Sequence, residues 1–297
     1  MKVIITGSGG LLGTELLNQL KNYEEVEVYA LTSKYSSLVT KYKNNRNIRI
    51  CNSSITAVNK MELTKEDILI NCAFPRDIQA DMASGLKYIK EILEVVVYKG
   101  IGKVINISSQ SVYSQNRVCP AKEGDTVKLE SMYSVGKYAT ELLTESICKN
   151  INYTNIRLAS LIGVQFEQRI TNKLVKQVIQ HNDLRIIGGQ QIFSFLDVRD
   201  AASALIKMVQ LPTNNWKKIY NLGTNEAYTL SELTEIIISI GKKSFCLNAR
   251  MEVEKKDNWQ NFQLDSSIFY RQFNWLPCYK IQDTVKEIYL KYLENRG

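Results

Sequence analysis

The sequence predicts an α/β fold in which a doubly wound, mostly parallel sheet is accompanied by a smaller C-terminal lobe. Three observations lead to this prediction. Between residues 2 and 160, short apolar segments alternate with amphipathic ones. The short segments are apolar at nearly every position, which is typical of parallel strands buried on both faces. A glycine-rich loop also joins the first apolar segment to the first amphipathic one.

The first strand and helix show the pattern most clearly. Residues 2–6 read KVIIT and end at glycines, and the next segment places leucines 12, 16, 17 and 20 on one helical face. The same reasoning gives the later elements of this half. Strands are expected at 26–32, 47–51, 67–73, 102–108 and 154–159, and helices at 81–98 and 130–149.

After residue 160 the alternation becomes looser. A helix over 229–241 is expected to begin near Thr229 or Ser231 and to end near Gly241. The remaining elements follow from shorter patterns. Helices are expected at 170–180, 199–210 and 281–297, and strands at 184–189, 193–198 and 219–223.

Composition and charge exclude several classes of protein. Apolar residues make up 44% of the 297 residues, which is enough for a sizeable core. The net charge of +8 comes from scattered lysines and arginines, so no nucleic-acid partner is expected. Six cysteines form no C-x-x-C pair and the chain has one histidine, so no metal site is expected. No apolar segment is long enough for a signal peptide or a membrane helix, which favours a cytoplasmic protein.

The loop TGSGGLLG places Gly7, Gly10 and Gly13 at G-x-x-G-x-x-G spacing between the first strand and the first helix. Glycines let the backbone turn tightly and approach a ligand, and the helix N-terminus then offers N–H groups to a phosphate. In this position the spacing is a dinucleotide-binding signature. The alternative is a glycine-rich turn that only closes a strand onto a helix.

The end of the second strand bears on which dinucleotide binds. NAD sites often have an acidic residue there, which holds the ribose 2′-hydroxyl. This strand instead ends in Thr32, Ser33 and Lys34. Because the lysine could neutralise a 2′-phosphate, NADP is slightly favoured over NAD. The alternative is a solvated Lys34 and an NAD cofactor.

Tyr133 and Lys137 are four residues apart in an expected helix, so they share one helix face. A lysine cation near a phenol stabilises the phenolate and brings tyrosine toward acid/base chemistry at neutral pH. Alone, the spacing also fits two solvated surface residues. The preceding strand, however, ends in Ser108 and Ser109, and that end of a doubly wound sheet faces the ligand crevice. A serine, a tyrosine and a lysine are therefore expected to meet beside the dinucleotide.

These segments together resemble the extended short-chain dehydrogenase/reductases of the nucleotide-sugar epimerase/dehydratase family, nearly from end to end. The glycine loop, the serine-bearing strand end ISSQSVYS and the helix motif YSVGK all match the family pattern. Three later segments resemble it as well, in the same order along the chain: FSFLDVRDAASAL, IYNLGTNEAYTLSEL and LDSSIFYRQFNWLP.

The resemblance implies a function for individual residues. Ser109 would orient the substrate, Tyr133 would be the catalytic acid/base, and Lys137 would make the phenol more acidic and contact the nicotinamide ribose. Ser54 takes the place of an adenine-contacting aspartate. The residues implied in cofactor binding are Gly7, Gly10, Leu11, Leu12, Gly13, Thr32, Ser33, Lys34, Ser54, Ile55, Cys72, Ala73, Phe74, Ile107, Tyr133 and Lys137.

The resemblance also implies two structural units and a homodimer. A dinucleotide-binding Rossmann domain would cover 1–163 and be rejoined by 192–222, and a smaller substrate-binding lobe would be formed by 164–191 and 223–297. Dimerisation would pack the helices at 81–98 and 130–149 into a four-helix bundle.

Two departures from the family narrow the expected reaction. Gln110 and Ser111 replace the Asp-Glu pair with which 4,6-dehydratases eliminate water, so dehydration is not expected. Phe193 replaces an arginine that contacts the substrate diphosphate in 4-epimerases. Four basic residues are candidates to take over that contact: Arg169, Arg185, Lys255 and Lys256.

The expected function is therefore NAD(P)-dependent hydride transfer at a ring carbon of a nucleotide-linked sugar. A 4-epimerase and a 4-ketoreductase both need the same serine, tyrosine and lysine, and both stay open. Two alternatives lie outside this reading. One is a reductase or dehydrogenase of a small molecule without a nucleotide, and the other is a non-catalytic protein that senses NAD(P).

Overall fold

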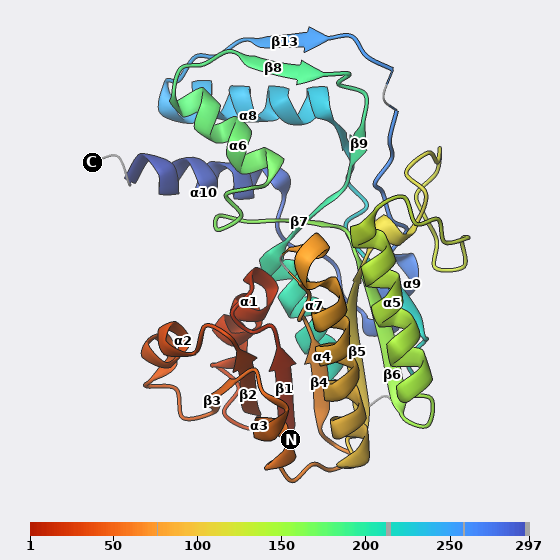
Figure 1. The fold of residues 1–297 in the computed structure, drawn as a ribbon. Helices are drawn as coiled ribbons and strands as arrows, with labels where there is room; N and C mark the ends of the chain where they lie inside the picture. Colours follow the sequence, from red (N-terminus) through yellow and green to blue (C-terminus); the bar gives the residue numbers. More distant parts are fainter. Residues whose placement is uncertain (76, 212–214, 258, 295–297) are drawn as a thin grey trace.

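The computed structural model describes residues 1–75, 77–211, 215–257 and 259–294, and its centre is a seven-stranded sheet (Figure 1). All strands run parallel in the order β11-β6-β5-β4-β1-β2-β3, which confirms the predicted doubly wound α/β class. The strands are β1 (Lys2–Thr6), β2 (Glu27–Thr32), β3 (Ile48–Asn52), β4 (Ile68–Asn71), β5 (Lys103–Ser109), β6 (Asn152–Leu158) and β11 (Ile219–Leu222).

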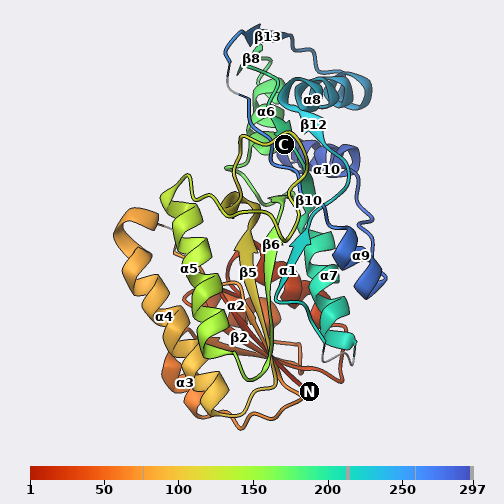
Figure 2. The same cartoon turned by 90° about the vertical axis from the view of Figure 1, so that its right-hand side faces the viewer.

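Helices cover both faces of the sheet because strand side chains alternate between the two faces (Figure 2). Val3 and Ile5 pack into one core with α1, α2, α7 and α9, whereas Ile4 packs into the other with α3, α4 and α5. The helices of the first core are α1 (Leu11–Leu20), α2 (Tyr35–Tyr42), α7 (Val198–Gln210) and α9 (Ser267–Phe273). Those of the second are α3 (Ile55–Asn59), α4 (Ile78–Tyr98) and α5 (Met132–Ile147).

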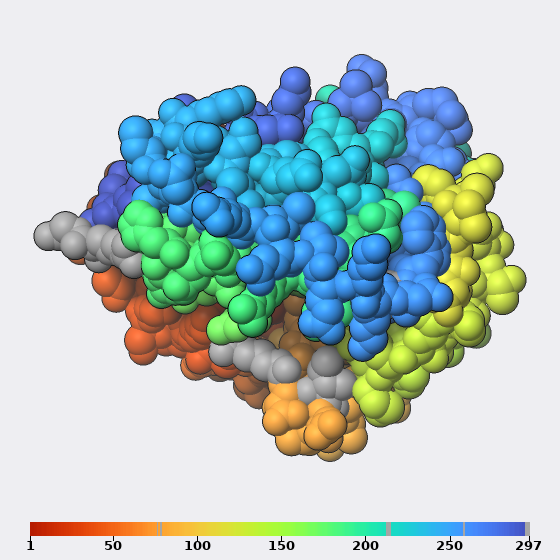
Figure 3. All heavy atoms as spheres, turned by 90° about the horizontal axis from the view of Figure 1, so that it is seen from above, coloured from red at the N-terminus to blue at the C-terminus, as the bar shows by residue number. Residues whose placement is uncertain are grey.

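A smaller lobe with its own apolar core lies at the carboxyl ends of the strands and covers much of that end when seen from above (Figures 1 and 3). Its helices are α6 (Ile170–Ile179), α8 (Leu230–Phe245) and α10 (Ile281–Glu294). Short strands pair in twos: β7 (Ser160–Ile162) with β10 (Phe195–Asp197), β9 (Ile192–Phe193) with β12 (Tyr228–Thr229), and β8 (Leu184–Ile187) with β13 (Met251–Glu254). We propose the division at 1–163, 164–191, 192–222 and 223–297. The position of β11 in the main sheet supports the return of 192–222, whereas α9, although it lies within 223–297, packs against the sheet domain.

The structure corrects the predicted end of α8. The helix begins at the predicted cap, where Thr229 and Glu232 form a capping box, but it continues past Gly241 to Phe245. Gly241 therefore lies within the helix and does not end it. A Cβ there would lie 2.7 Å from the Tyr289 hydroxyl of α10. The glycine instead lets α8 pack closely against α10.

The structure also adds elements that the sequence patterns did not predict. Helix α2 separates two strands that were expected to follow one another, and α4 begins at Ile78 rather than at residue 81. The Asp77 carboxylate caps that earlier start by accepting hydrogen bonds from the backbone N–H groups of Gln79 and Ala80. Among the described helices, none is both long and apolar enough to cross a membrane.

A buried ion pair joins α5 to the centre of the sheet. Arg157 of β6 donates two hydrogen bonds to the Glu141 carboxylate of α5, at 2.9 and 2.7 Å, and both side chains are almost fully buried. The Ser108 hydroxyl at the end of β5 donates a third bond to the same carboxylate. Burial lowers the pKa of Arg157, but the hydrogen bonds and charge of Glu141 outweigh it and the pKa is raised. Arg157 therefore stays charged and holds three elements together.

We predict that Arg157→Met will destabilise the protein by about 3–5 kcal/mol, because it leaves the Glu141 carboxylate buried without its partner. Urea unfolding followed by circular dichroism measures the free energy of unfolding. Lys90→Met is the control, since Lys90 pairs with Glu94 on the exposed side of α4 and such pairs contribute about 0–1 kcal/mol. Equal effects of the two substitutions would contradict the prediction.

Candidate active site

The glycine loop makes a tight turn against the end of β4. Gly7 has a φ of +63°, and a Cβ there would lie 2.8 Å from the backbone of Cys72 and Ala73. The N–H of Gly10 donates to the Gly7 carbonyl at 2.8 Å, and Gly10 caps α1 without offering a side chain. A Cβ on Gly13 would lie 2.5 Å from the Gly7 carbonyl oxygen. The loop therefore brings backbone and an uncapped helix N-terminus to one side of a cavity, which suits a pyrophosphate.

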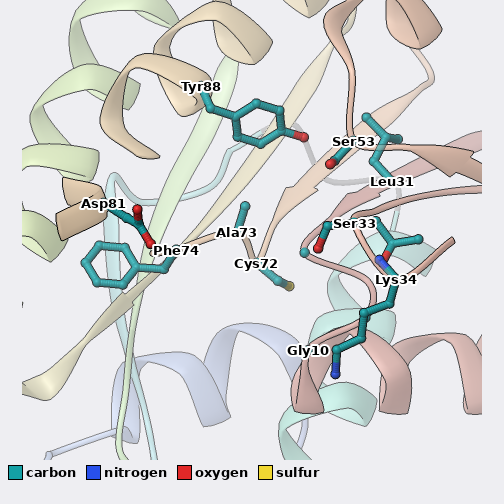
Figure 4. A pocket seen from close by; sticks show the side chains of 13 residues that line it. Gly10, Leu31, Ser33, Lys34, Ser53, Cys72, Ala73, Phe74, Asp81 and Tyr88 are labelled. Carbon is teal, nitrogen blue, oxygen red and sulfur yellow. The ribbon is translucent and has the colours of Figure 1, made fainter. Parts of the chain in front are cut away.

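This first cavity, of about 460 Å³, lies between the glycine loop, β2 and α4 (Figure 4). Eight residues predicted to bind the cofactor line it: Gly7, Gly10, Thr32, Ser33, Lys34, Cys72, Ala73 and Phe74. Five further residues line it that sequence reasoning did not identify: Gly9, Leu31, Ser53, Asp81 and Tyr88. Gly9 belongs here because a Cβ on it would lie 2.6 Å from the Thr32 hydroxyl.

Tyr88 supplies a polar group that has no partner within the described residues. Its hydroxyl is buried and unpaired, and it points toward Ser53 in Figure 4. Burial raises the pKa of Tyr88 to about 12, so the phenol is a hydrogen-bond donor at neutral pH. An unpaired buried donor and a backbone cradle that tolerates no Cβ are what a bound dinucleotide would satisfy. The residues present therefore fit a dinucleotide.

Eight of the sixteen residues predicted to bind the cofactor lie outside this cavity, and four of those, Leu11, Gly13, Ser54 and Ile55, line neither this cavity nor the one that holds Tyr133. The Ser54 hydroxyl caps α3 by accepting from the N–H of Ala57, and it lines a neighbouring cavity on the β3 side. Ile55 packs against the core beneath α4, and Leu11 lines a small cavity beside Arg199. Ser53, one residue earlier, occupies the position in the first cavity that was expected for Ser54.

A second cavity, of about 400 Å³, adjoins the first at Cys72, which lines both. It contains all three predicted catalytic residues, Ser109, Tyr133 and Lys137, together with Leu12 and Ile107 from the predicted cofactor set. Its other lining residues are Ser108, Gln110, Ser111, Leu158, Ala159, Ser160, Leu161 and Arg169. No carboxylate lines it among the described residues.

Tyr133 and Lys137 lie on the face of α5 that meets α4 and β5. The Lys137 ammonium donates to the Ile107 carbonyl at 2.9 Å and lies 4.2 Å from the centre of the Phe74 ring and 6.0 Å from that of Tyr133. Phe74 packs edge-on against Tyr133 at 5.3 Å. A Cβ on Gly136 would lie 2.4 Å from Met82, so the missing side chain lets α5 approach α4 closely. The lysine is thus held in place with N–H donors to spare.

The Ser109 hydroxyl lies at the carboxyl end of β5. It accepts hydrogen bonds from the backbone N–H and the hydroxyl of Ser111, at 3.2 and 3.0 Å. Because the oxygen is the acceptor in both bonds, its own proton stays available to a ligand. A substrate carbonyl or alkoxide in the second cavity could accept a hydrogen bond from this hydroxyl.

The two departures from the family pattern are also located by the structure. Gln110 and Ser111 line the second cavity where an acid pair would be needed for elimination. Phe193 stacks on Phe195 and Phe262, with ring centres 5.5 and 4.9 Å apart. Of the four basic candidates, Arg169 lines the second cavity. Arg185 instead pairs with Glu252 on the surface.

Cys72 lies between the two cavities but is poorly suited to nucleophilic chemistry. Burial raises the pKa of its thiol to about 12, although the charge of Lys137 opposes this shift. The thiol is therefore protonated at neutral pH, and the thiolate is the reactive form. Chemistry in this cavity rests on the hydroxyls and the lysine.

Comparison with known proteins gives a consistent picture. The model of the NAD dependent epimerase/dehydratase family matches residues 3–223. Protein CapI of Staphylococcus aureus is 25% identical over 99% of each chain. A UDP-glucuronic acid 4-epimerase from Bacillus cereus, in complex with UDP-glucuronic acid and NAD, superposes with a TM-score of 0.83 at 19% identity over 100% of both chains. A dTDP-glucose 4,6-dehydratase from Bacillus anthracis, in complex with NAD, also has a TM-score of 0.83 at 19% identity, over 100% of this chain and 97% of its own.

Proposed function

The chain belongs to the NAD-dependent epimerase/dehydratase family and is an enzyme of that NAD(P)-dependent type, and we propose that it is a 4-epimerase of a nucleotide-linked sugar. One observation carries the proposal. Ser109, Tyr133 and Lys137 line a cavity that contains no carboxylate among the described residues and that adjoins the dinucleotide cavity. These three side chains suit the transfer of a hydride and a proton at one carbon. Without a carboxylate, the cavity does not suit the elimination of water.

The side chains have separate functions in this proposal. A nicotinamide cofactor held by the glycine loop would supply the acceptor and donor of the hydride. Tyr133 takes the proton of the reacting hydroxyl and gives it back, and Lys137 stabilises the phenolate that forms in between. The Ser109 hydroxyl would donate a hydrogen bond to the developing carbonyl oxygen and so orient the sugar. In an epimerase the sugar is reduced from its other face.

A 4,6-dehydratase is disfavoured, although such enzymes are among the similar structures. Elimination of water requires a group that removes a ring proton and an acid that protonates the leaving oxygen. Gln110 and Ser111 offer an amide and a hydroxyl, neither of which titrates near neutral pH. This supports hydride chemistry without elimination.

A 4-ketoreductase is the second candidate. It is favoured by Lys34, a residue of the first cavity that would suit NADP(H). Family membership supports a nicotinamide cofactor. Lys34 lines the cavity next to Thr32, and its backbone N–H donates to the Thr32 hydroxyl at 2.9 Å. We propose that Lys34 lets NADP(H) bind at least as tightly as NAD(H), which would suit a reductase.

Arg169 is the proposed contact for the substrate diphosphate. It is the N-cap residue of α6 and lines the second cavity, and its guanidinium lies 5.9 Å from the centre of the Phe166 ring. Guanidinium groups bind phosphate oxygens in a bidentate manner. Arg169 would therefore replace the arginine that is absent at Phe193.

We also propose a cytoplasmic homodimer. Met132, Val135 and Leu142 are apolar, exposed and on one side of α5, as expected for residues covered by a partner helix. The cysteines of the described residues are free thiols, which suits a reducing compartment. Light scattering that gives a monomer mass at micromolar concentration would contradict the dimer, and recovery in an extracytoplasmic fraction would contradict the compartment.

We predict that Tyr133→Phe lowers turnover of UDP-sugars or 4-keto sugars by about 10²- to 10⁴-fold, the usual contribution of a general acid/base. Binding of the cofactor, measured by fluorescence titration, should persist. Tyr138→Phe on the same helix is the control, because Tyr138 packs against the core instead. Unchanged turnover of Tyr133→Phe would remove the residue from its proposed function.

The nucleotide carried by the purified protein separates the two candidate reactions. Denaturation followed by chromatography should release stoichiometric NAD from an epimerase, which regenerates its cofactor in every cycle. A protein without bound nucleotide that reduces 4-keto sugars with NADPH would instead establish the ketoreductase.

We predict that Lys34→Ala weakens NADPH binding by about tenfold and leaves NADH binding nearly unchanged, because one charge-assisted contact to a 2′-phosphate is lost. Fluorescence titration of both cofactors measures the ratio. Lys43→Ala, an exposed lysine after α2, is the control and should change neither affinity. An equal loss for both cofactors would contradict a contact at the 2′ position.

We predict that Arg169→Gln raises KM for the nucleotide sugar by about tenfold, with kcat within twofold, because a contact to a non-reacting phosphate is lost. Steady-state kinetics give both constants. Arg185→Gln removes a guanidinium that pairs with Glu252 on the surface, and it should leave KM unchanged. If Arg169→Gln leaves KM unchanged and Arg185→Gln raises it, the diphosphate binds elsewhere.

A further inference from the structure

Another cavity lies at the opposite end of the sheet from the glycine loop, at the amino ends of β4, β5, β6 and β11. In Figure 1 the loops that enter β4, β5 and β6 are at the bottom of the molecule, away from the C-terminal lobe. The cavity measures about 750 Å³. Because neither the cofactor nor the substrate is expected here, its composition calls for a separate explanation.

The wall of this cavity is basic. Lys65, Lys103, Lys149 and Lys218 line it, and no aspartate or glutamate does so among the residues that the structure describes. The lysines come from four separate loops or strand ends, so they are not one periodic run on a helix. Four cations that converge without a counter-ion repel one another, and an anion in the cavity would relieve that repulsion.

The backbone fixes how these loops meet. Lys103 begins β5 and lies directly across from Asn152 of β6, whose N–H donates to the Gly102 carbonyl. A Cβ on Gly102 would lie 1.8 Å from the Lys65 carbonyl oxygen, so the loop before β4 packs against this point. The Lys218 carbonyl accepts from the N–H of Asn155. The lysines are therefore held by the sheet itself.

Lys103 is the most informative of the four. It is only 6% exposed, yet within the described residues its ammonium has no hydrogen bond and no ion pair. Lysines elsewhere on the protein do find carboxylates, as Lys87 does with Glu91 and Lys90 with Glu94. The Lys103 Nζ is not among the solvent-shielded unpaired atoms of the described residues, so the ammonium reaches solvent although most of the side chain is buried. An anion in the cavity would supply the partner that this ammonium lacks.

Two buried donors add to the same wall. Trp216 Nε1 and Asn152 Nδ2 are shielded from solvent and have no partner among the described residues. Both are N–H groups, so the unsatisfied positions here share the preference of the lysines for an acceptor. Lys218 also lies 3.8 Å from the centre of the Tyr153 ring, which holds its ammonium near the cavity.

We propose that this cavity binds a multiply charged phosphate-bearing anion, such as pyrophosphate or the diphosphate of a free nucleotide. Phosphate oxygens accept several hydrogen bonds at once and carry the charge needed to offset the four ammonium groups. The site is remote from the dinucleotide. Lys103 and Ser109 are the two ends of β5, and seven residues of strand span roughly 20 Å.

Isothermal titration with pyrophosphate at low salt tests the proposal. It is performed with excess NAD, so that the glycine loop is occupied. Lys149→Gln/Lys218→Gln removes two exposed cations of the cavity and should weaken binding at least about tenfold. The control Lys242→Gln/Lys243→Gln removes two exposed lysines of α8 and should leave the affinity within twofold.

Acylation of lysines, read by mass spectrometry, supplies a second measurement that does not depend on variants. Pyrophosphate should protect Lys65, Lys149 and Lys218 while leaving Lys242 and Lys243 reactive. UDP binding that is tighter than pyrophosphate binding and that Lys149→Gln/Lys218→Gln weakens would identify a nucleotide as the source of the phosphates, and equal binding of the two would identify a free anion. The proposal is overturned if NAD abolishes binding, if both double variants bind alike, or if no cavity lysine is protected.

Discussion

The buried pair of Arg157 and Glu141 is the interaction on which the geometry of the active site depends. Glu141 lies one helical turn beyond Lys137 and two beyond Tyr133, so the bond to Arg157 sets which face of α5 turns toward the sheet. The same carboxylate accepts from Ser108, the residue before Ser109. One charged group therefore positions both the helix with the acid/base residues and the strand end with the hydroxyl. An apolar contact could pack as well, but it would not fix the rotation of the helix in this way.

Much of the sheet could be predicted from the sequence, since its strands are buried on both faces and consist of uniform apolar runs. The elements that were missed are those where this signal is weak. Helix α2 buries only Leu38 and Tyr42, and α3 is a single turn. Strand β13 exposes three of its four residues, so no alternation marks it. The end of α8 was wrong because a glycine, which usually stops a helix, here makes room for Tyr289. Only the tertiary contact distinguishes these two uses of glycine.

The residues of the site likewise include some that the sequence could predict and some that it could not. Ser109, Tyr133 and Lys137 could be placed together because one strand and the next helix carry them. Tyr88 and Ser53 could not, because they reach the first cavity from α4 and from the end of β3, and no local motif marks them. Arg169 and Arg185 were equal candidates in the sequence. The fold separates them by giving Arg185 a carboxylate partner and placing Arg169 in a cavity wall.

A parallel sheet has two unlike ends, and this chain places cations at both. Lys34, Lys137 and Arg169 line the cavities at the carboxyl ends of the strands, and Lys65, Lys103, Lys149 and Lys218 line the one at the amino ends. The two ends are separated by about twice the Debye length of roughly 8–10 Å in physiological salt. Through solvent, charge at one end is thus largely screened from the other. Any influence of an anion at Lys103 on Ser109 must therefore be carried by β5 itself and by the Glu141–Arg157 pair beside it. Because both are rigid and buried, the two sites are expected to bind their ligands nearly independently.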